Sequence, residues 1–258
     1  MYKHIPNLIT LTNLMSGCVG IAQASEGRFV NAAYCIIISA VLDFFDGFAA
    51  RWLKAFSPIG KDLDSLADVV SFGVLPAFML FQWMNLLAPF HSSALYNIYA
   101  YMMFLPAASS ALRLARFNHD ETQKKSFLGL PTPAHALFWA AMFIALAQTP
   151  CLRGPAPHNS INFPYLSFAY TDPLCPLWVD LFLSPYFIVL LVFLFTWLLN
   201  APIRLMAFKF SSFHIKINLY VYLFLGISLV LILWKGFVSA PIILFLYLLF
   251  SFIHFRKT

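Results

Sequence analysis

The sequence predicts an all-α integral membrane protein, and three observations support this fold class. Of the 258 residues, 61% are hydrophobic and only 10% are charged, whereas soluble domains carry about 25% charged residues. No strand-like alternation typical of a membrane barrel is visible. The apolar residues instead form long blocks, each close to the ~20 residues that a helix needs to cross a bilayer. These eight blocks lie at roughly 8–25, 30–50, 63–84, 95–115, 133–150, 178–200, 216–234 and 237–255.

We therefore expect about eight transmembrane helices, because backbone polar groups in lipid must be satisfied within each segment. The first block lacks a clear small-residue cleavage site, so we interpret it as the first span and not as a leader. The polar stretch 116–128 and the loop 151–177 are the long connections, and the G-L-P-T-P run at 129–133 should break the chain before the fifth span. We expect no soluble appendage. A disulfide between Cys151 and Cys175 stays open.

The net charge of +6 is explained by membrane topology and does not require a nucleic-acid partner. With the N-terminus in the cytoplasm, only Arg28, Arg153 and Lys235 lie outside. This satisfies the positive-inside rule and predicts an even number of spans. The other thirteen basic residues then lie inside: Lys3, Arg51, Lys54, Lys61, Arg113, Arg116, Lys124, Lys125, Arg204, Lys209, Lys216, Arg256 and Lys257.

Four carboxylates at the edges of two neighbouring spans form the candidate site. Asp43 and Asp46 are three residues apart near the end of the second span, and Asp64 and Asp68 are four apart near the start of the third. Residues at these spacings share a helix face. Because the connection is short and the two spans are antiparallel, we expect the two pairs to face each other on the cytoplasmic side. Ionisable residues in a membrane helix are expensive and usually functional.

Four such carboxylates would repel one another without a cation, so we expect them to bind Mg²⁺ or Mn²⁺, which prefer oxygen ligands. Such ions also bind phosphate oxygens. Gly47, Ala50 and Gly60 would let a ligand approach the backbone, and Arg51 could bind a phosphate. A proton or cation pathway through buried acids, with small residues for helix packing, is the alternative interpretation.

Residues 43–68 resemble the CDP-alcohol phosphotransferase family. They match its signature, D-x2-D-G-x2-A-R-x8-G-x3-D-x3-D, at all eight fixed positions. The resemblance implies a six-helix catalytic core over about residues 1–200, with residues 201–258 as two additional helices. It also implies two metal ions held by Asp43, Asp46 and Asp64, with Asp68 as a ligand or as the general base. It further implies that Asp46, Gly47, Ala50, Arg51 and Gly60 line the CDP site, and we add Asn7 and Thr10 of the first span as candidate CDP-lipid residues.

The acceptor alcohol is indicated by other stretches. Asn7, Thr10 and Asn13 form a polar stripe on the first span, which indicates either a lined cavity or helix–helix hydrogen bonding. R-L-A-R-F-N at 113–118, followed by F-L-G-L-P-T-P at 127–133 and preceded by D-S-L-A-D-V-V-S-F-G-V-L-P-A at 64–77, resembles the phosphatidylserine synthase branch. Arg113 or Arg116 would bind the serine carboxylate, and Asn118 or a main-chain carbonyl would bind its ammonium.

The resemblance implies that the hydroxyl of L-serine attacks CDP-diacylglycerol and that CMP leaves. It implies a multi-pass protein of the cell (inner) membrane with its active site facing the cytoplasm. The expected partners are the two substrates and the lipid bilayer, with a second copy of the chain as a candidate homodimer partner. Two alternatives stay open: a sister enzyme that uses glycerol 3-phosphate or inositol phosphate, and a cation- or proton-coupled transporter.

Overall fold

The structure is a computed structural model that describes residues 4–55, 57–88, 96–119, 127–149, 176–205 and 219–256. Helices dominate these ranges, and each of the eight apolar blocks contains helix. The all-α membrane class predicted from the sequence is therefore confirmed. Cys151, Cys175 and most of the loop 151–177 lie outside the described residues, so the disulfide stays a prediction.

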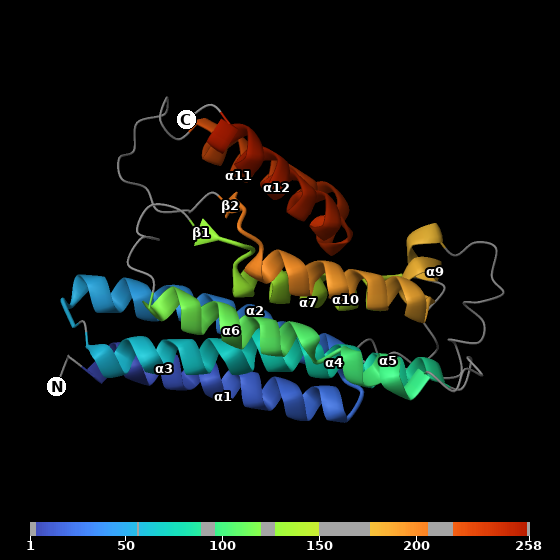
Figure 1. Ribbon diagram of the computed structural model, residues 1–258, viewed down its shortest axis with the longest axis horizontal. Helices are drawn as coiled ribbons and strands as arrows, with labels where there is room; N and C mark the ends of the chain where they lie inside the picture. Colours follow the sequence, from blue (N-terminus) through green and yellow to red (C-terminus); the bar gives the residue numbers. More distant parts are fainter. Residues whose placement is uncertain are drawn as a thin grey trace.

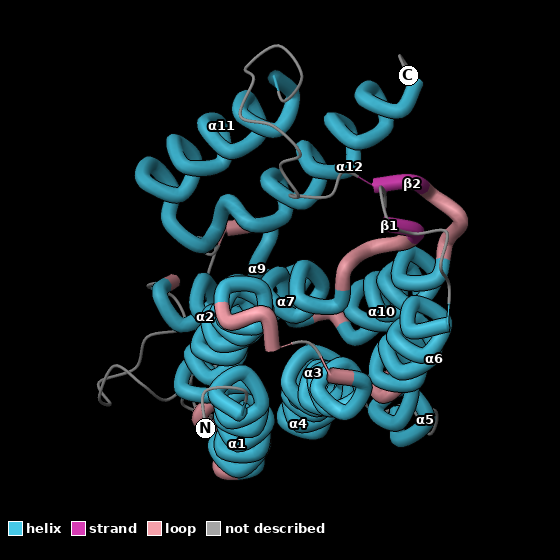
Figure 2. Tube along the Cα trace, turned by 90° about the vertical axis from the view of Figure 1, so that its left-hand side faces the viewer, coloured by secondary structure: helices cyan, strands magenta, loops and turns pink. Residues whose placement is uncertain are grey.

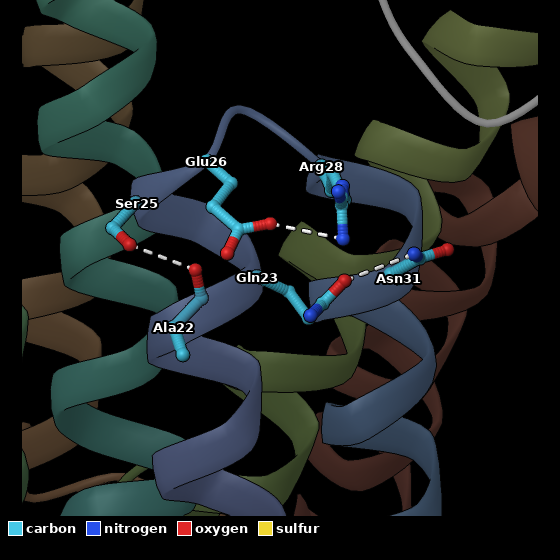
Figure 3. A network of polar contacts seen from close by, with 6 residues as sticks. All are labelled: Ala22, Gln23, Ser25, Glu26, Arg28 and Asn31. Carbon is cyan, nitrogen blue, oxygen red and sulfur yellow. Dashed lines mark hydrogen bonds and ion pairs between the residues drawn. The ribbon is translucent and has the colours of Figure 1, made fainter.

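Helices α1 (Ile5–Ser25) and α2 (Phe29–Trp52) form an antiparallel pair with the most extensive helix–helix contact in the described chain. The turn between them uses Gly27 at a φ of +73°, a conformation that favours glycine. Figure 3 shows the polar contacts that close this end of the pair. Arg28 makes an ion pair with Glu26 at 2.9 Å, and Asn31 donates to Gln23 at 3.0 Å.

The third span is one continuous helical rod of three parts, α3 (Pro58–Asp68), the π-helix η2 (Val69–Val74) and α4 (Leu75–Leu87). Ser57 caps its start by accepting a hydrogen bond from the Gly60 N–H at 2.9 Å. The π-helix ends beside Pro76, which has no N–H to donate to the Phe72 carbonyl. This irregular turn begins directly after Asp68, and π-turns are frequent at functional sites.

The fourth and sixth apolar blocks are each divided into two helices. The fourth is divided into α5 (Tyr96–Met102) and α6 (Leu105–His119), and α7 (Thr132–Gln148) follows as the fifth unit. The sixth bends by 81° at Ser184, between α9 (Leu177–Leu183) and α10 (Pro185–Asn200). Pro185 begins the second part, since proline suits the first position of a helix but disrupts its interior.

Two short strands, β1 (Phe127–Leu128) and β2 (Arg204–Leu205), pair antiparallel, a feature that the sequence did not predict. They form where the chain entering α7 meets the chain leaving α10. Gly129 follows β1 at a φ of +73°, and a Cβ there would collide with the carbonyl of Leu199. The predicted break before the fifth span is therefore confirmed, with α7 beginning at Thr132.

Helices α11 (Leu219–Lys235) and α12 (Ala240–Arg256), joined by the 3₁₀ turn η5 (Gly236–Ser239), form a hairpin above the other helices (Figure 1). Figure 2 shows α1, α2, α3 and α6 side by side in a bundle, with the β1–β2 pair between α6 and the hairpin. Val221, Phe224 and Tyr247 join the hairpin to the common apolar core.

The lengths of the described helices fix only part of the span count. Ile5–Ser25, Phe29–Trp52 and Pro58–Leu87 are each long and apolar enough to cross a membrane, and the bent pair α9–α10 would make a fourth. The exact number of eight spans therefore stays a prediction. Large apolar side chains such as Phe44, Phe48 and Trp197 are exposed on the surface, as expected where lipid replaces water.

Candidate active site

Three of the four predicted carboxylates form a compact cluster between α2 and α3. Asp43, Asp64 and Asp68 each place one oxygen atom within 4.8 Å of the others. Because α2 and α3 run in opposite directions and both pack on α1, pairs at i,i+3 and i,i+4 can meet at the same depth. The short turn after Trp52 and the Ser57 cap set this register. The arrangement suits a shared cation.

Asp46 is not part of this trio. It is 5% exposed, and its Oδ2 accepts a hydrogen bond from Thr10 Oγ1 of α1 at 2.7 Å. It still lies close enough to Asp43 and Asp64 to interact with both electrostatically. One of its oxygens is therefore committed to α1, and the carboxylate borders the cluster.

The donor set fits a hard divalent cation. Asp64 Oδ1 and Asp68 Oδ1 are buried without a hydrogen-bond partner. Among the residues that the structure describes, no Lys or Arg makes a salt bridge with the cluster. Buried carboxylates without compensation are very costly, so a cation is the physical solution. Ligands that are all oxygen favour Mg²⁺, Mn²⁺ or Ca²⁺ over softer metals.

The residues predicted to bind the CDP-lipid lie next to the carboxylate cluster on α1, α2 and α3. No heavy atom lies within 4 Å of the position that a Cβ on Gly47 would occupy, so the helix backbone is open to a ligand there. A Cβ on Gly60 would lie 3.0 Å from Asn7 Oδ1, which places these two predicted residues in contact. Ala50 is half-buried beyond Gly47, and Arg51 is exposed in the last turn of α2.

The two predicted arginines of α6 have different surroundings. Arg113 is 8% exposed, its Nε has no hydrogen-bond partner, and it lies close enough to Asp68 for electrostatic interaction. Arg116 is exposed. Both nevertheless line one cavity of about 580 Å³, with His119 and Asn200 also on its wall. Arg113 is therefore the arginine nearer to the carboxylates.

Asn118 connects α6 to α3. Its Nδ2 donates to Ser65 Oγ at 2.8 Å, and its carbonyl accepts from Lys61 Nζ at 2.6 Å. These bonds hold the end of α6 against the helix that carries Asp64 and Asp68. Asn118, which was predicted to bind the serine ammonium, thus uses its amide nitrogen in a helix–helix contact.

Residues 3–171 match the family described as CDP-alcohol phosphatidyltransferase, which is well over half of the chain. The chain belongs to this family. The family resemblance found in the sequence is therefore confirmed, and enzymes of this family depend on divalent metal ions. For this family member, the oxygen cluster of α2 and α3 could hold such a metal.

Curated relatives of this CDP-alcohol phosphatidyltransferase carry a more specific name. A Bacillus subtilis (strain 168) protein named CDP-diacylglycerol–serine O-phosphatidyltransferase is 35% identical over 135 residues, 51% of this chain and 70% of that protein. Proteins of the same name from Helicobacter pylori (strain J99) and Methanocaldococcus jannaschii are 36% and 35% identical, and the matches cover 54% and 57% of their lengths. Both matches cover about half of this chain.

Two features of this family member's site were not assigned from the sequence. Asn13, noted only as part of a polar stripe, is fully buried beside Asp68. Ser65, on α3, receives the hydrogen bond from Asn118. The helical spacing of Asn7, Thr10 and Asn13 could have pointed to Asn13. The contact between Asn118 and Ser65 joins residues 53 apart, so no local sequence pattern could have predicted it.

Proposed function

We propose that this CDP-alcohol phosphatidyltransferase transfers the phosphatidyl group of CDP-diacylglycerol to the hydroxyl of L-serine, forming phosphatidylserine and CMP. The observation that carries the proposal is the cluster of Asp43, Asp64 and Asp68 with a buried arginine beside it. The names of the curated relatives from three organisms support the choice of donor and acceptor.

Asp43, Asp46, Asp64 and Asp68 would hold two ions of Mg²⁺ or Mn²⁺. Bound there, divalent cations neutralise pyrophosphate charge and polarise phosphorus toward attack. The unpartnered Oδ1 atoms of Asp64 and Asp68 support this assignment, because each has an acceptor position that no protein group fills. Thr10 orients Asp46 through its 2.7 Å hydrogen bond.

The protein side chains position the reactants and move one proton. Gly47 and Gly60 leave room for the CDP moiety, and Asn7, Ala50 and Arg51 border the same space. Asp68 accepts the proton of the serine hydroxyl while the serine oxygen forms a bond to the phosphatidyl phosphorus. The bond from that phosphorus to the bridging oxygen breaks, and CMP leaves with the electron pair. No covalent enzyme intermediate is needed.

Arg113 is the better candidate for the serine carboxylate because it is buried and lies near Asp68. A guanidinium binds a carboxylate through two parallel hydrogen bonds. The same cavity also contains Arg116, so a phosphorylated acceptor such as glycerol 3-phosphate or inositol phosphate is the alternative that the cavity favours. Arg113 alone suffices for a single carboxylate.

The protein would lie in the cell (inner) membrane with the cluster facing the cytoplasm. Asp43 and Asp46 lie in the second half of α2, nearer to the end that carries Arg51 and is followed by Lys54. A transporter would instead place its acids near the bilayer midplane. Lipid tails can remain in the bilayer while the headgroup reaches the cluster from the side.

The test is CMP release by the purified full chain with CDP-diacylglycerol and Mg²⁺ or Mn²⁺. Serine, glycerol 3-phosphate and inositol phosphate are offered separately, and each reaction is repeated with EDTA. We expect CMP only with serine and only with metal. Release with glycerol 3-phosphate but not serine would assign the chain to a sister activity. No release with any acceptor would contradict the transferase proposal.

A further inference from the structure

Asn13 is a fully buried residue whose amide oxygen has no hydrogen-bond partner among the described residues. The residue is 0% exposed, its Nδ2 faces the Asp68 carboxylate as a hydrogen-bond donor, and its Oδ1 has no partner among the described residues. A primary amide offers two donors and an acceptor with two lone pairs. Leaving such a group unpaired in a buried position is unfavourable, and most buried polar side chains are paired. The position is therefore a candidate for contact with a ligand.

The position of Asn13 is fixed without the help of its amide. Its backbone carbonyl accepts hydrogen bonds from Ser71 Oγ of η2 at 3.1 Å and from Ser39 Oγ of α2 at 3.4 Å. Gly17, one turn further along α1, allows this close approach, because a Cβ there would lie 2.6 Å from Ser71 Oγ. The side chain is thus presented by the framework and does not hold the framework together.

The amide lies at the reactive end of the carboxylate cluster. Asn13 is close enough to Asp68 to interact with its carboxylate, and Asp68 Oδ1 is itself unpartnered. On the other side, Asp68 interacts electrostatically with Arg113, whose Nε has no partner. Three helices therefore contribute a neutral amide, a carboxylate and a guanidinium around Asp68, each with at least one unpartnered polar atom.

We propose that Asn13 binds the ammonium group of the acceptor and thereby selects an amino acid over other alcohols, an inference that rests on the proposed function. Serine carries three polar groups, and this place holds a complementary partner for each. Asp68 takes the hydroxyl, Arg113 takes the carboxylate, and Asn13 Oδ1 accepts from the ammonium. An amide oxygen accepts this bond without adding charge beside the carboxylates.

This assignment differs from the sequence-based expectation that Asn118 would bind the ammonium. The bond from the Asn118 amide nitrogen to Ser65 holds that side chain in the contact between α6 and α3, and the residue is only partly buried at the end of α6. Asn13 is fully buried and adjacent to the base. Because hydrogen bonds to a charged group are worth more in a buried place, Asn13 is the stronger discriminator.

The experiment compares serine with 3-hydroxypropionate, which is serine without its amino group. In the wild type, we expect 3-hydroxypropionate to compete with serine far more weakly than serine itself binds. In Asn13→Leu and Asn13→Ala, the KM for serine should rise by about 10- to 100-fold, the loss typical of one hydrogen bond to a charged group. The inhibition constant of 3-hydroxypropionate and the KM for CDP-diacylglycerol should stay unchanged.

Two controls separate recognition from architecture. Ser71→Ala removes the hydrogen bond to the Asn13 backbone carbonyl but keeps the amide. Asn31→Leu removes a partly buried amide that bonds to Gln23 at the opposite end of the α1–α2 pair (Figure 3). Both should retain the wild-type preference for serine over 3-hydroxypropionate.

Several results would overturn the inference. In the wild type, 3-hydroxypropionate that competes as strongly as serine would exclude an ammonium contact, whatever the variants do. Constants for serine, 3-hydroxypropionate and CDP-diacylglycerol that rise together in the Asn13 variants would assign a structural role. An unchanged KM for serine would also reject it. A wild type that releases no CMP with serine would overturn the proposed function as well, whereas the other results leave that function intact.

Discussion

Asp43 and Asp46 are three residues apart on α2, yet their surroundings differ. Asp43 meets Asp64 and Asp68 across the helix interface, whereas Asp46 accepts a hydrogen bond from Thr10. The spacing within each helix could be predicted from the sequence, because the helical period fixes which residues share a face. The Thr10–Asp46 contact could not, because it joins residues 36 apart and depends on how α1 rotates against α2.

The first prediction concerns the loss of a single metal-binding carboxylate, Asp43 or Asp64. Asp43→Asn and Asp64→Asn each remove one charged oxygen ligand from a cluster that the other carboxylates cannot complete alone. CMP release should fall below detection at any practical metal concentration, while the protein still unfolds cooperatively in detergent. The surface variant Asp180→Asn on α9 serves as control. Near-normal turnover in either cluster variant would argue against a shared metal.

The second prediction separates binding from proton transfer at Asp68. An amide cannot take the proton from the serine hydroxyl. Asp68→Asn should therefore lower CMP release by roughly 10²–10⁴-fold, the range typical of losing a general base. Binding of CDP-diacylglycerol, measured by calorimetry in detergent, should persist. If the CDP-lipid dissociates in parallel, Asp68 acts chiefly as a metal ligand and its role as base is wrong.

The third prediction uses the contrast between the arginines of α6. Arg113 is buried and Arg116 is exposed, so only the first is held in a fixed orientation near Asp68. Arg113→Lys keeps the charge but loses the two-pronged geometry, and the KM for serine should rise by about tenfold with little change for CDP-diacylglycerol. Arg116→Lys should be nearly silent. Equal effects at both positions would contradict the assignment of the carboxylate to Arg113.

At the scale of elements, the close packing of α1 against the third span sets the geometry of the site. A Cβ on Gly17 would crowd Ser71, and one on Gly20 would lie 2.5 Å from Leu75 Cδ2. Small residues at helix interfaces allow such approach in membranes. The helices themselves were predictable from apolar blocks and caps. The π-helix after Asp68 was not predicted, because a proline in an apolar block marks an irregular turn without specifying which residues form it.

The fourth prediction compares two glycines that differ in their surroundings. Gly47 faces open space, so Gly47→Ala should leave thermal stability unchanged or raise it by up to about 1 kcal/mol, since alanine favours helix. Its KM for CDP-diacylglycerol should nevertheless increase, because the new methyl group occupies the proposed nucleotide space. Gly17→Ala should instead lower the melting temperature, since Ser71 must move. A stable Gly47→Ala with unchanged kinetics would show that no ligand approaches α2 there.

At the scale of the whole molecule, the C-terminal hairpin is joined to the same region as the site. Tyr247 of α12 is 4% exposed and interacts electrostatically with Arg113, and α12 packs on α7 and β2. The sequence predicted two additional helices after residue 200 but gave no contact partner for them. A long apolar block predicts that a segment is a membrane helix, but it does not predict which other helices that segment packs against.

The fifth prediction tests the orientation of the molecule in the membrane. The 24 residues of α2 rise by about 1.5 Å each, so its ends are separated by roughly 36 Å, more than the ~30 Å hydrocarbon core. The charge distribution places Lys54 inside and the Glu26–Arg28 turn outside. In a background without the four native cysteines, Lys54→Cys should react with a membrane-impermeant thiol reagent only in inside-out vesicles. Glu26→Cys should react only in right-side-out vesicles, and losing its exposed ion pair costs little stability. Labelling of both positions from one side would reject this topology and, with it, a cytoplasmic carboxylate cluster.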